Sequence, residues 1–436
     1  MADKGSNRKF RYELDEKPGW LPLMLYGVQW FLVTVPVLII IGSLVGEMQF
    51  DTVVEKTFYT QKLFALVGIA LIVQLLWGHK LPIVIGPATV LVVGIIASQS
   101  QSIPSIYTAI ITGGALLFLL SFTPRLRHLK DIFTPRIVVV ILALIAITLM
   151  PTIIELSFSG GLSPDIKYIF FLSLSVALII GNYLLKGIWK STILLWGIII
   201  GTLTHRLLSS DWSLPTLPSN EAASPSFFIP AIEFDAGVLL AFLFCYVALL
   251  INELGSVQAV SQAINSGGET QRTIKGLRFV GIFNAINGLF GVIGPVDFSM
   301  SPGIIMNTRC ASRYTLIPAG IGLILCAIFP QAILFLTTIP EAVMGIILLY
   351  LMATQLGSAL QMISVQSLIQ TFDHAIIIAV PIMMALFTVF LPEEVVTAIP
   401  QILRPILANG FVVGILFVIL LEHLFNRKRT PLNNTK

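Results

Sequence analysis

Long apolar stretches recur along the whole chain and are separated by short polar segments. A helix needs about 20 apolar residues to cross the hydrocarbon core of a bilayer. Windows of that length predict fourteen spans, at residues 21–46, 60–77, 81–98, 107–123, 134–152, 167–186, 190–208, 234–262, 276–293, 296–312, 314–336, 339–360, 373–391 and 404–425. We therefore predict an all-α polytopic membrane protein.

The third and tenth predicted spans are interrupted by glycine and proline. The third begins with LPIVIGPAT, residues 81–89, in which Gly86 and Pro87 mark the break. The tenth lies within GPVDFSMSPGIIMNTR, residues 294–309. Because proline removes a backbone donor and clashes with the preceding turn, neither stretch suits one continuous helix. Each is expected to be a short extended segment followed by a half-helix, lining a cavity or buried in protein.

The second half-helix has a start signal. Ser301 is a good N-cap residue, and Pro302 and Gly303 suit the first turn. A half-helix that begins near the middle of the bilayer points free N–H groups and the positive end of its dipole at whatever occupies the cavity. Residues 294–309 are therefore predicted to form part of a binding site.

The fourteen spans divide into two sets of seven, and the broken span is the third of each set. An odd number of spans per repeat inverts the second copy, so the two half-helices would face each other across one cavity, as is typical of transporters. The predicted organisation is an N-terminal tail (1–20), a first seven-span repeat (21–208), an extracellular loop (209–233), a second seven-span repeat (234–425) and a C-terminal tail (426–436).

Charge supports this interpretation. Only 11% of the 436 residues are charged, against roughly 25% in soluble proteins. With fourteen spans, five of the 26 Lys and Arg residues fall on the side opposite the termini, namely Lys56, Lys62, Lys167, Arg206 and Arg404. Because basic loops face the cytoplasm, both termini are predicted to be cytoplasmic, in a bacterial plasma membrane. The net charge of +4 is spread over the loops and does not suggest a nucleic-acid partner.

The sequence carries no sign of a metal, disulfide or catalytic site. Cys245, Cys310 and Cys326 lie in apolar segments without ligand spacing. The histidines lie near span ends, and neither a paired nucleophile and base nor a zinc motif is present. We expect no cofactor, no metal and no enzymatic activity.

Glu253 and Asp297 are the two candidate functional carboxylates within the apolar spans. Glu253 lies in INELGSVQ, residues 251–258, and Asp297 lies in the broken tenth span. An ionisable residue inside a membrane is a functional candidate because its burial is costly. In the structural alternatives, Glu253 pairs with Arg272 or Lys275 near the cytoplasmic end of its span, and Asp297 caps backbone N–H groups.

Two other polar features have two interpretations each. Gln29 in the first span either hydrogen-bonds a ligand or satisfies the broken backbone nearby. Residues 355–370 are amphipathic and predict an interfacial helix, with a core element as the alternative.

Several of these motifs together resemble the nucleobase-cation symporter 2 family, also called nucleobase-ascorbate transporters. The family signature is Gln/Glu/Pro-Asn-x-Gly-x-x-x-x-Thr-Arg, and MSPGIIMNTR, residues 300–309, matches it at Gly303, Thr308 and Arg309. LPIVIG at 81–86, GLFG at 288–291 and VQW at 28–30 are similar to further family elements. The resemblance covers most of the chain.

The resemblance implies a fold of seven plus seven inverted spans, divided into a core domain and a gate domain and usually dimeric. Substrate would lie between the third and tenth spans, and the core would move against the gate. The implied function is a membrane permease for nucleobases driven by proton symport. Purines such as xanthine, urate, hypoxanthine or guanine are favoured, and uracil is the alternative. The implied partners are the nucleobase, the coupling proton, the lipid bilayer and a second copy of the chain.

The same resemblance implies the binding residues. Alignment on Gly255 places Asn252 where the family has a substrate-binding Glu, whereas a shift of one residue places Glu253 there. Met300 and Ser301 replace the second acid or amide of the family and its neighbouring Asn. The implied site is completed by Phe298, Ser299, Thr89 and Gln29.

The replacement of family acids by Asn252 and Met300 affects both substrate binding and proton coupling. Asn252 still offers a donor and an acceptor to a base, whereas Met300 cannot replace a hydrogen bond. Neither residue titrates, so Glu253 and Asp297 are the candidate proton carriers. Two other functions remain open. Two half-helix N-termini suit an inorganic anion or carboxylate transporter of the same fold, and the missing acids suit a membrane receptor that does not transport.

Overall fold

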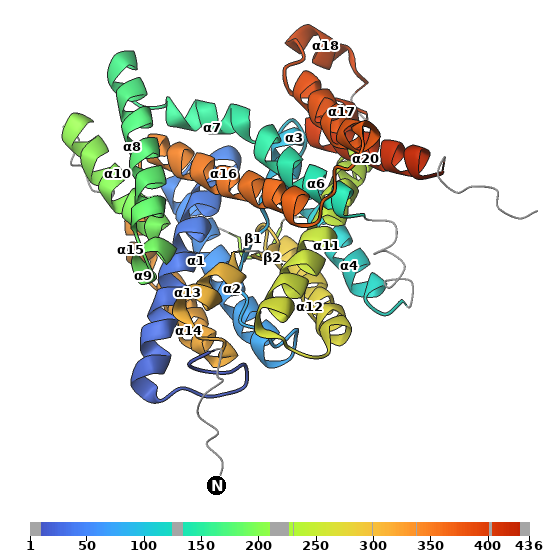
Figure 1. The fold of residues 1–436 in the computed structure, drawn as a ribbon. Helices are drawn as coiled ribbons and strands as arrows, with labels where there is room; N and C mark the ends of the chain where they lie inside the picture. Colours follow the sequence, from blue (N-terminus) through green and yellow to red (C-terminus); the bar gives the residue numbers. More distant parts are fainter. Residues whose placement is uncertain are drawn as a thin grey trace, which may run out of the picture.

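The computed structural model is nearly all helical and is built around a small sheet (Figure 1). It describes residues 10–123, 134–209, 226–229, 231–298, 300–336, 338–400 and 403–427. Ser299 and most of the predicted tails and of the 209–233 loop lie outside these residues.

The first half of the chain contains one strand and nine described helices. Their bounds are α1 Trp20–Gln49, α2 Val53–Leu76, β1 Ile85–Pro87, α3 Thr89–Ala97, α4 Ile103–Leu120, α6 Pro135–Thr148, α7 Met150–Ser157, α8 Pro164–Leu184, α9 Ile188–Ser191 and α10 Ile193–Ser209.

The second half contains the other strand of the sheet. Its bounds are α11 Ala236–Ile264, α12 Glu269–Leu289, β2 Pro295–Asp297, α13 Ser301–Thr308, the 3-10 helix η1 Arg313–Leu316, α14 Ile317–Ile328, α15 Pro330–Leu336, α16 Glu341–Val365, α17 Phe372–Val389, α18 Glu393–Ala398, α19 Arg404–Leu407 and α20 Gly410–Arg427.

The protein is a multi-pass membrane protein. Among the described residues, eight helices are long and apolar enough to cross a bilayer, and a ninth span results if the bent pair Arg313–Ile328 and Pro330–Leu336 is one crossing. The count of fourteen spans stays a prediction, because several of the predicted spans form shorter or broken helices.

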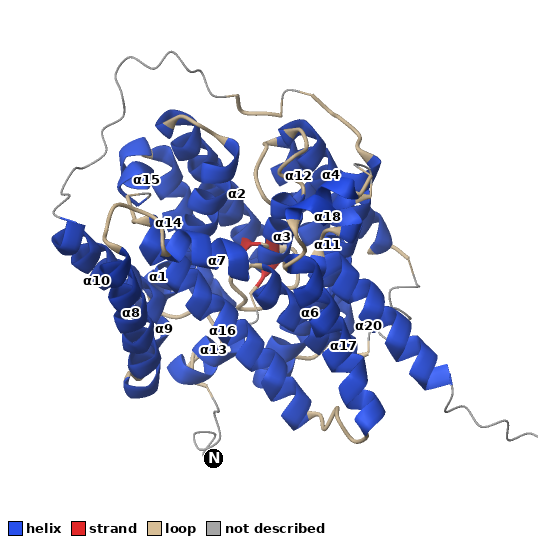
Figure 2. Ribbon diagram, turned by 90° about the horizontal axis from the view of Figure 1, so that it is seen from above, coloured by secondary structure: helices blue, strands red, loops and turns tan. Residues whose placement is uncertain are grey.

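Both predicted breaks form short extended segments followed by half-helices. Strands β1 and β2 pair antiparallel, with Ile85 opposite Asp297, Gly86 opposite Val296 and Pro87 opposite Pro295. Pairing with each other satisfies backbone groups that have no water to bond in a bilayer. Helices α3 and α13 start directly after the two strands, so their N-termini lie near the centre of the molecule (Figure 2).

The helices pack into two groups. One group joins α2 to α14, α4 to α12, α1 to α14, and α11 to α3 and α4. The other joins α16 to α6 and α7, α17 to α20 and α6, and α8 to α10. The sheet belongs to the first group, and α16 passes above it in Figure 1.

Glycines allow very close contact between α4 and α12 in the first group. A Cβ atom at Gly114 would lie 2.5 Å from the backbone nitrogen of Ala285, and one at Gly281 would lie 2.5 Å from that of Phe118. Small residues that let helix backbones touch are the usual means of tight packing in membranes. The tightly packed pair α4 and α12 contacts α11, and α12 also contacts β2.

The N-terminal segment packs along the chain that follows α13. The backbone N–H of Arg11 donates to the carbonyl of Arg309, and that of Ala311 donates to the carbonyl of Tyr12. The side chain of Arg313 bonds the Asp15 carboxylate at 2.8 Å and the carbonyl of Leu75 at 2.5 Å. These contacts fix the end of the half-helix opposite the sheet.

The prediction of a separate interfacial helix at residues 355–370 is wrong. Helix α16 continues without a break from Glu341 to Val365. The first half of this helix, around Ile347, is buried, and the second half continues it as the same helix. The amphipathic pattern arises because one face of that second half lines a cavity.

Candidate functional site

A cavity of about 190 Å³ lies where the two half-helices begin, between the two helix groups. Its wall from the first group contains Val37, Thr89, Val90, Ala248, Asn252, Val296, Phe298 and Met300. Its wall from the second group contains Leu142, Ile145, Leu351, Met352, Thr354, Gln355 and Ser358. A small cavity that is mostly apolar, with a few polar groups aimed into it, is the usual form of a site for a small organic molecule.

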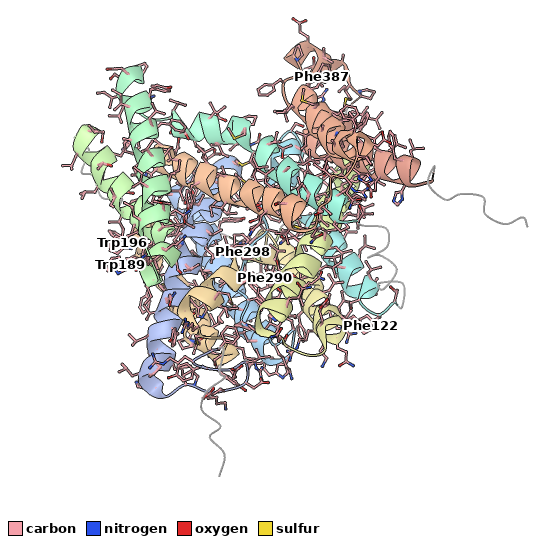
Figure 3. The ribbon with its side chains drawn as sticks, viewed as in Figure 1. Phe122, Trp189, Trp196, Phe290, Phe298 and Phe387 are labelled. Carbon is pink, nitrogen blue, oxygen red and sulfur yellow. The ribbon has the colours of Figure 1, made fainter. Side chains whose placement is uncertain are left out.

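Phe298 presents its ring at this cavity and rests on the backbone of β1. Its backbone N–H donates to the carbonyl of Val84 at 2.8 Å, which extends the strand pairing by one bond. A Cβ atom at Gly86 would lie only 2.2 Å from Cζ of the ring. Glycine at this position therefore gives the ring its place near the centre of the molecule, where Figure 3 marks it.

Ser301 joins the two broken segments through its hydroxyl. The hydroxyl accepts the backbone N–H of Val84 at 3.0 Å and donates to the carbonyl of Phe298 at 2.9 Å. The side chain is fully buried. It thus satisfies backbone groups of both segments. The predicted N-cap role of Ser301 is wrong, because Met300 is the N-cap of α13 and Ser301 is its first residue, with its hydroxyl bonded to the two segments before the helix.

Asn252 of α11 lines the cavity and also bonds the broken backbone. Its Nδ2 donates to the carbonyl of Asp297 at 3.1 Å, and the Ser256 hydroxyl donates to the same oxygen at 3.1 Å. Asn252 is partly buried, whereas Ser256 is fully buried. The amide therefore reaches the cavity and the tenth span at once.

Behind Asn252, away from the cavity wall, lies a cluster of three fully buried ionisable side chains: His79, Glu253 and Asp297. Oε2 of Glu253 accepts the backbone N–H of Asp297 at 3.3 Å. Nε2 of His79 lies 3.3 Å from Oδ2 of Asp297. Because the Glu253 carboxyl bonds the peptide of Asp297 itself, the two carboxyl groups are neighbours, and one bound proton would relieve their repulsion.

Comparison with known proteins decides the family. Residues 21–394 match the family model Xan_ur_permease, whose description is "Permease family". The chain belongs to this permease family. The resemblance that the sequence motifs indicate is confirmed.

Relatives of this permease are named as transporters of purines. It is 24% identical to the xanthine permease of Bacillus subtilis (strain 168) over 412 residues, covering 92% of this chain and 93% of that protein. It is 25% identical to the uric acid permease PucJ of the same organism, covering 82% of each chain. It is 24% identical to the uric acid transporter UacT of Escherichia coli (strain K12), covering 80% of this chain and 73% of that protein.

Solved structures of other transporters share the fold of the permease. The transmembrane domain of a cyanobacterial bicarbonate transporter, BicA, superposes with a TM-score of 0.61 at 14% identity, over 86% of this chain and 98% of that one. The murine anion transporter Slc26a9, described as inward-facing, superposes with a TM-score of 0.60 at 12% identity, over 98% of this chain and 74% of that one. At these identities the likeness shows the fold alone.

The permease brings most of the predicted binding residues together. Thr89, Asn252, Phe298 and Met300 line the cavity. Ser301 and Glu253 lie directly behind this wall, and Ser299 lies outside the described residues.

Gln29 stands apart from the cavity wall. It is buried, and neither its side-chain nitrogen nor its side-chain oxygen has a hydrogen-bond partner among the described residues. The interpretation of Gln29 as a partner of the broken backbone is thus not the observed one, and its contact with a ligand stays a prediction.

The predicted motif residues have separate structural roles. Gly86 and Pro87 form β1, and Pro302 opens α13. Gly255 and Gly303 have open space where a Cβ atom would be. The Thr308 hydroxyl donates to the carbonyl of Ile304, and Arg309 ends α13 in a left-handed conformation with φ of 51°.

The alternative pairing of Glu253 with Arg272 or Lys275 is not the observed one. Arg272 donates instead to the carbonyls of His79 and Lys80, at 2.9 and 3.2 Å. Lys275 is exposed. Asp297 caps no half-helix with its side chain, because that side chain is directed at His79.

The sequence analysis missed His79, Ser256 and the polar face of α16. His79 lies at the end of α2, and nothing in the pattern indicates that it folds back against the tenth span. Thr354, Gln355 and Ser358 carried a signal, because their spacing places them on one helical face. Within the described residues, no group of three or more His, Cys, Asp or Glu side chains is arranged to hold a metal ion.

We predict that Gly86→Ala displaces the Phe298 ring and lowers uptake at limiting substrate by about tenfold, because one aromatic stacking contact contributes about 1 to 3 kcal/mol. Uptake kinetics of the variant measure this effect as a raised KM. Gly357→Ala is the matched control, because a Cβ atom there meets nothing within 4 Å. An unchanged KM in Gly86→Ala would show that the ring position does not matter for binding.

Proposed function

We propose that this permease transports nucleobases, most favourably oxopurines such as xanthine or urate. The observation that carries the proposal is the cavity in which the Phe298 ring and the Asn252 amide meet at the starts of two half-helices. The names of the relatives support the substrate class.

The chemistry of the cavity suits a flat, polar ring system. An oxopurine offers ring N–H donors beside carbonyl acceptors, and one amide side chain can meet such a pair. An aromatic face gives a further about 1 to 3 kcal/mol of stacking. The N-termini of α3 and α13 favour the electron-rich carbonyl edges of the base, or its anion.

The two helix groups suit the roles of a core and a gate. The sheet, both half-helices and Asn252 belong to the first group, whereas α16 supplies the opposite wall. We propose that the first group carries the base and moves against the second. In the same proposal the chain divides into two inverted repeats at residues 21–208 and 234–425, its termini are cytoplasmic, and it works as a homodimer in the plasma membrane.

Proton symport is part of the proposal. The carrier is the carboxyl pair Glu253 and Asp297, which is fully buried and lies one residue behind Asn252 along α11. Two adjacent buried carboxylates repel each other, so the pair favours binding a proton.

Gln355 gives the gate wall a polar contact with substrate. Its Nε2 donates to the carbonyl of Leu142 at 3.3 Å, and the side chain lines the cavity opposite Asn252. We predict that Gln355→Leu changes the ratio of xanthine to hypoxanthine uptake by about fivefold, since the two bases differ by one carbonyl and one hydrogen bond is worth about 1 kcal/mol. Gln361→Leu, at an exposed position of the same helix, is the control. Equal ratios in both variants would remove Gln355 from substrate recognition.

The test of the function is uptake of labelled xanthine, hypoxanthine, guanine, urate and uracil into cells that lack their own nucleobase permeases, with and without a protonophore. Saturable purine uptake that the protonophore abolishes is the expected result. Preference for uracil would move the substrate to pyrimidines. Uptake of bicarbonate or a carboxylate but of no base would replace the proposal by an anion transporter, and binding without uptake would replace it by a receptor.

A further inference from the structure

His79 is the member of the buried cluster that the proposed function leaves without a role. It follows α2 and precedes β1, and its side chain is fully buried. Its Nε2 lies 3.3 Å from the Asp297 carboxylate. A buried imidazole beside a carboxylate either carries a proton itself or holds its neighbour in one charge state.

The other ring nitrogen decides between these two roles. Nδ1 of His79 accepts the backbone N–H of Leu81 at 2.9 Å, so Nδ1 bears no proton. The proton of the neutral ring is therefore on Nε2, the atom that faces Asp297. A second proton at Nδ1 would break the bond from Leu81. His79 is thus held as a neutral ring whose Nε2–H faces the Asp297 carboxylate at 3.3 Å.

The other charged groups near His79 and Asp297 come from α11, from α12 and from the residue that follows His79. From α11, Glu253 meets Asp297 on its backbone side. From α12, Arg272 binds the carbonyls of His79 and Lys80 and interacts with Asp15 and Arg313. Lys80 is the charged neighbour of His79 along the chain.

Helix α12 also closes the cluster sterically. A Cβ atom at Gly276 would lie 3.0 Å from Oε1 of Glu253 and 3.3 Å from Cβ of His79. The side chains of Glu253 and His79 therefore have little room to change position.

We propose that His79 is a positioning residue that keeps Asp297 ionised, so that the carboxyl pair holds one exchangeable proton, on Glu253. The Nε2–H of His79 then faces the Asp297 carboxylate at 3.3 Å as a stabilising dipole, and the O–H of Glu253 is directed at the same carboxylate. The proton that moves is the one on Glu253, and His79 neither gains nor loses a proton during the cycle. This inference rests on the proposed function in one respect only, namely that the proton on Glu253 drives symport.

The peptide of Asp297 connects this proton to the cavity. Its N–H donates to Glu253, and its carbonyl accepts from Asn252, which lines the cavity. A substrate that takes the Asn252 N–H withdraws a donor from that carbonyl. Substrate in the cavity thereby affects Glu253, which holds the proton, through the peptide of Asp297.

The test counts protonated buried carboxyl groups by infrared absorption of the purified full-length permease in lipid vesicles. We expect roughly one such group per protein at neutral pH, lost in Glu253→Gln and kept in Asp297→Asn. His79→Leu removes the Nε2 donor, and we expect the count to rise to roughly two. His79→Gln places an amide N–H near the Nε2 position and should restore roughly one. His423→Leu, at an exposed position, is the control.

Three results would overturn the inference: a count that is unchanged in His79→Leu, a signal that follows Asp297 and not Glu253, or a His79 ring that is found protonated at both nitrogens by nitrogen-15 resonance. If His79→Leu does not give folded protein, the carboxyl count in His79→Gln and the nitrogen-15 resonances of the His79 ring in the unsubstituted permease still test its role. The count is read without transport. A permease with this count that moves no nucleobase would contradict the proposed function and leave the role of His79 standing.

Discussion

Asn252→Ala is expected to lower nucleobase uptake at limiting substrate by about 10- to 100-fold. The substitution removes a donor and an acceptor from the cavity wall, and each hydrogen bond contributes about 1 kcal/mol, or more where the substrate is left with a buried unpaired group. The carbonyl of Asp297 keeps its bond from Ser256 at 3.1 Å, so the tenth span retains a partner. Initial rates over a range of substrate concentrations measure the loss, which should appear mainly in KM.

Gln258→Ala is the matched control, because Gln258 is an exposed amide on the same helix and does not line the cavity. Both variants should unfold at nearly the temperature of the unsubstituted protein. Wild-type kinetics in Asn252→Ala would show that alignment on Gly255 misassigns the residue and would transfer the substrate contact to Glu253.

Glu253→Gln is expected to abolish accumulation of substrate against its gradient while leaving exchange of labelled for unlabelled base in place. The amide keeps the shape of the side chain and its acceptor for the Asp297 N–H, but it cannot bind and release a proton. Asp297→Asn should reduce accumulation as well, because it removes the carboxylate that receives the Glu253 O–H. Vesicles with an imposed pH gradient, compared with vesicles carrying substrate on both sides, separate the two activities.

Asp373→Asn provides the control for the loss of one carboxylate, since Asp373 is exposed at the start of α17. Full gradient-driven accumulation in both Glu253→Gln and Asp297→Asn would remove the carboxyl pair from coupling. The coupling proton would then be carried by another group. A permease that accumulates no substrate even without substitution would instead be a facilitator, as the absence of a titrating group at Asn252 and Met300 by itself suggests.

The positions of the two breaks could be predicted from sequence because their cause is local. Proline and glycine at 86–87 and 294–303 act on their own turn of backbone, and a lipid environment allows few alternatives for the freed groups. That the two half-helices face each other was expected from the predicted seven-plus-seven arrangement, whereas the antiparallel pairing of the strands before them was not predicted. The side chains that fill the cavity from the first group followed from the family motifs.

The remaining features depend on contacts between distant parts of the chain. His79 meets Asp297 across more than two hundred residues, and a sequence pattern shows only that His79 lies near the end of a span. Gly86 is recognisable as a break, but its contact with the Phe298 ring depends on strand register. The error at residues 355–370 has a similar origin, because an amphipathic helix has the same pattern whether its polar face meets the membrane interface or a cavity.

The pairing of β1 with β2 also has a consequence for how the chain is made. At about 5 to 20 residues per second, synthesis of the segment between Pro87 and Pro295 takes about 10 to 40 s. During that interval the N–H and C=O groups of β1 have no strand to bond, and lipid offers them nothing in exchange. The nascent first half must therefore be sheltered by the insertion machinery, or wait at the membrane surface, until the tenth segment emerges from the ribosome.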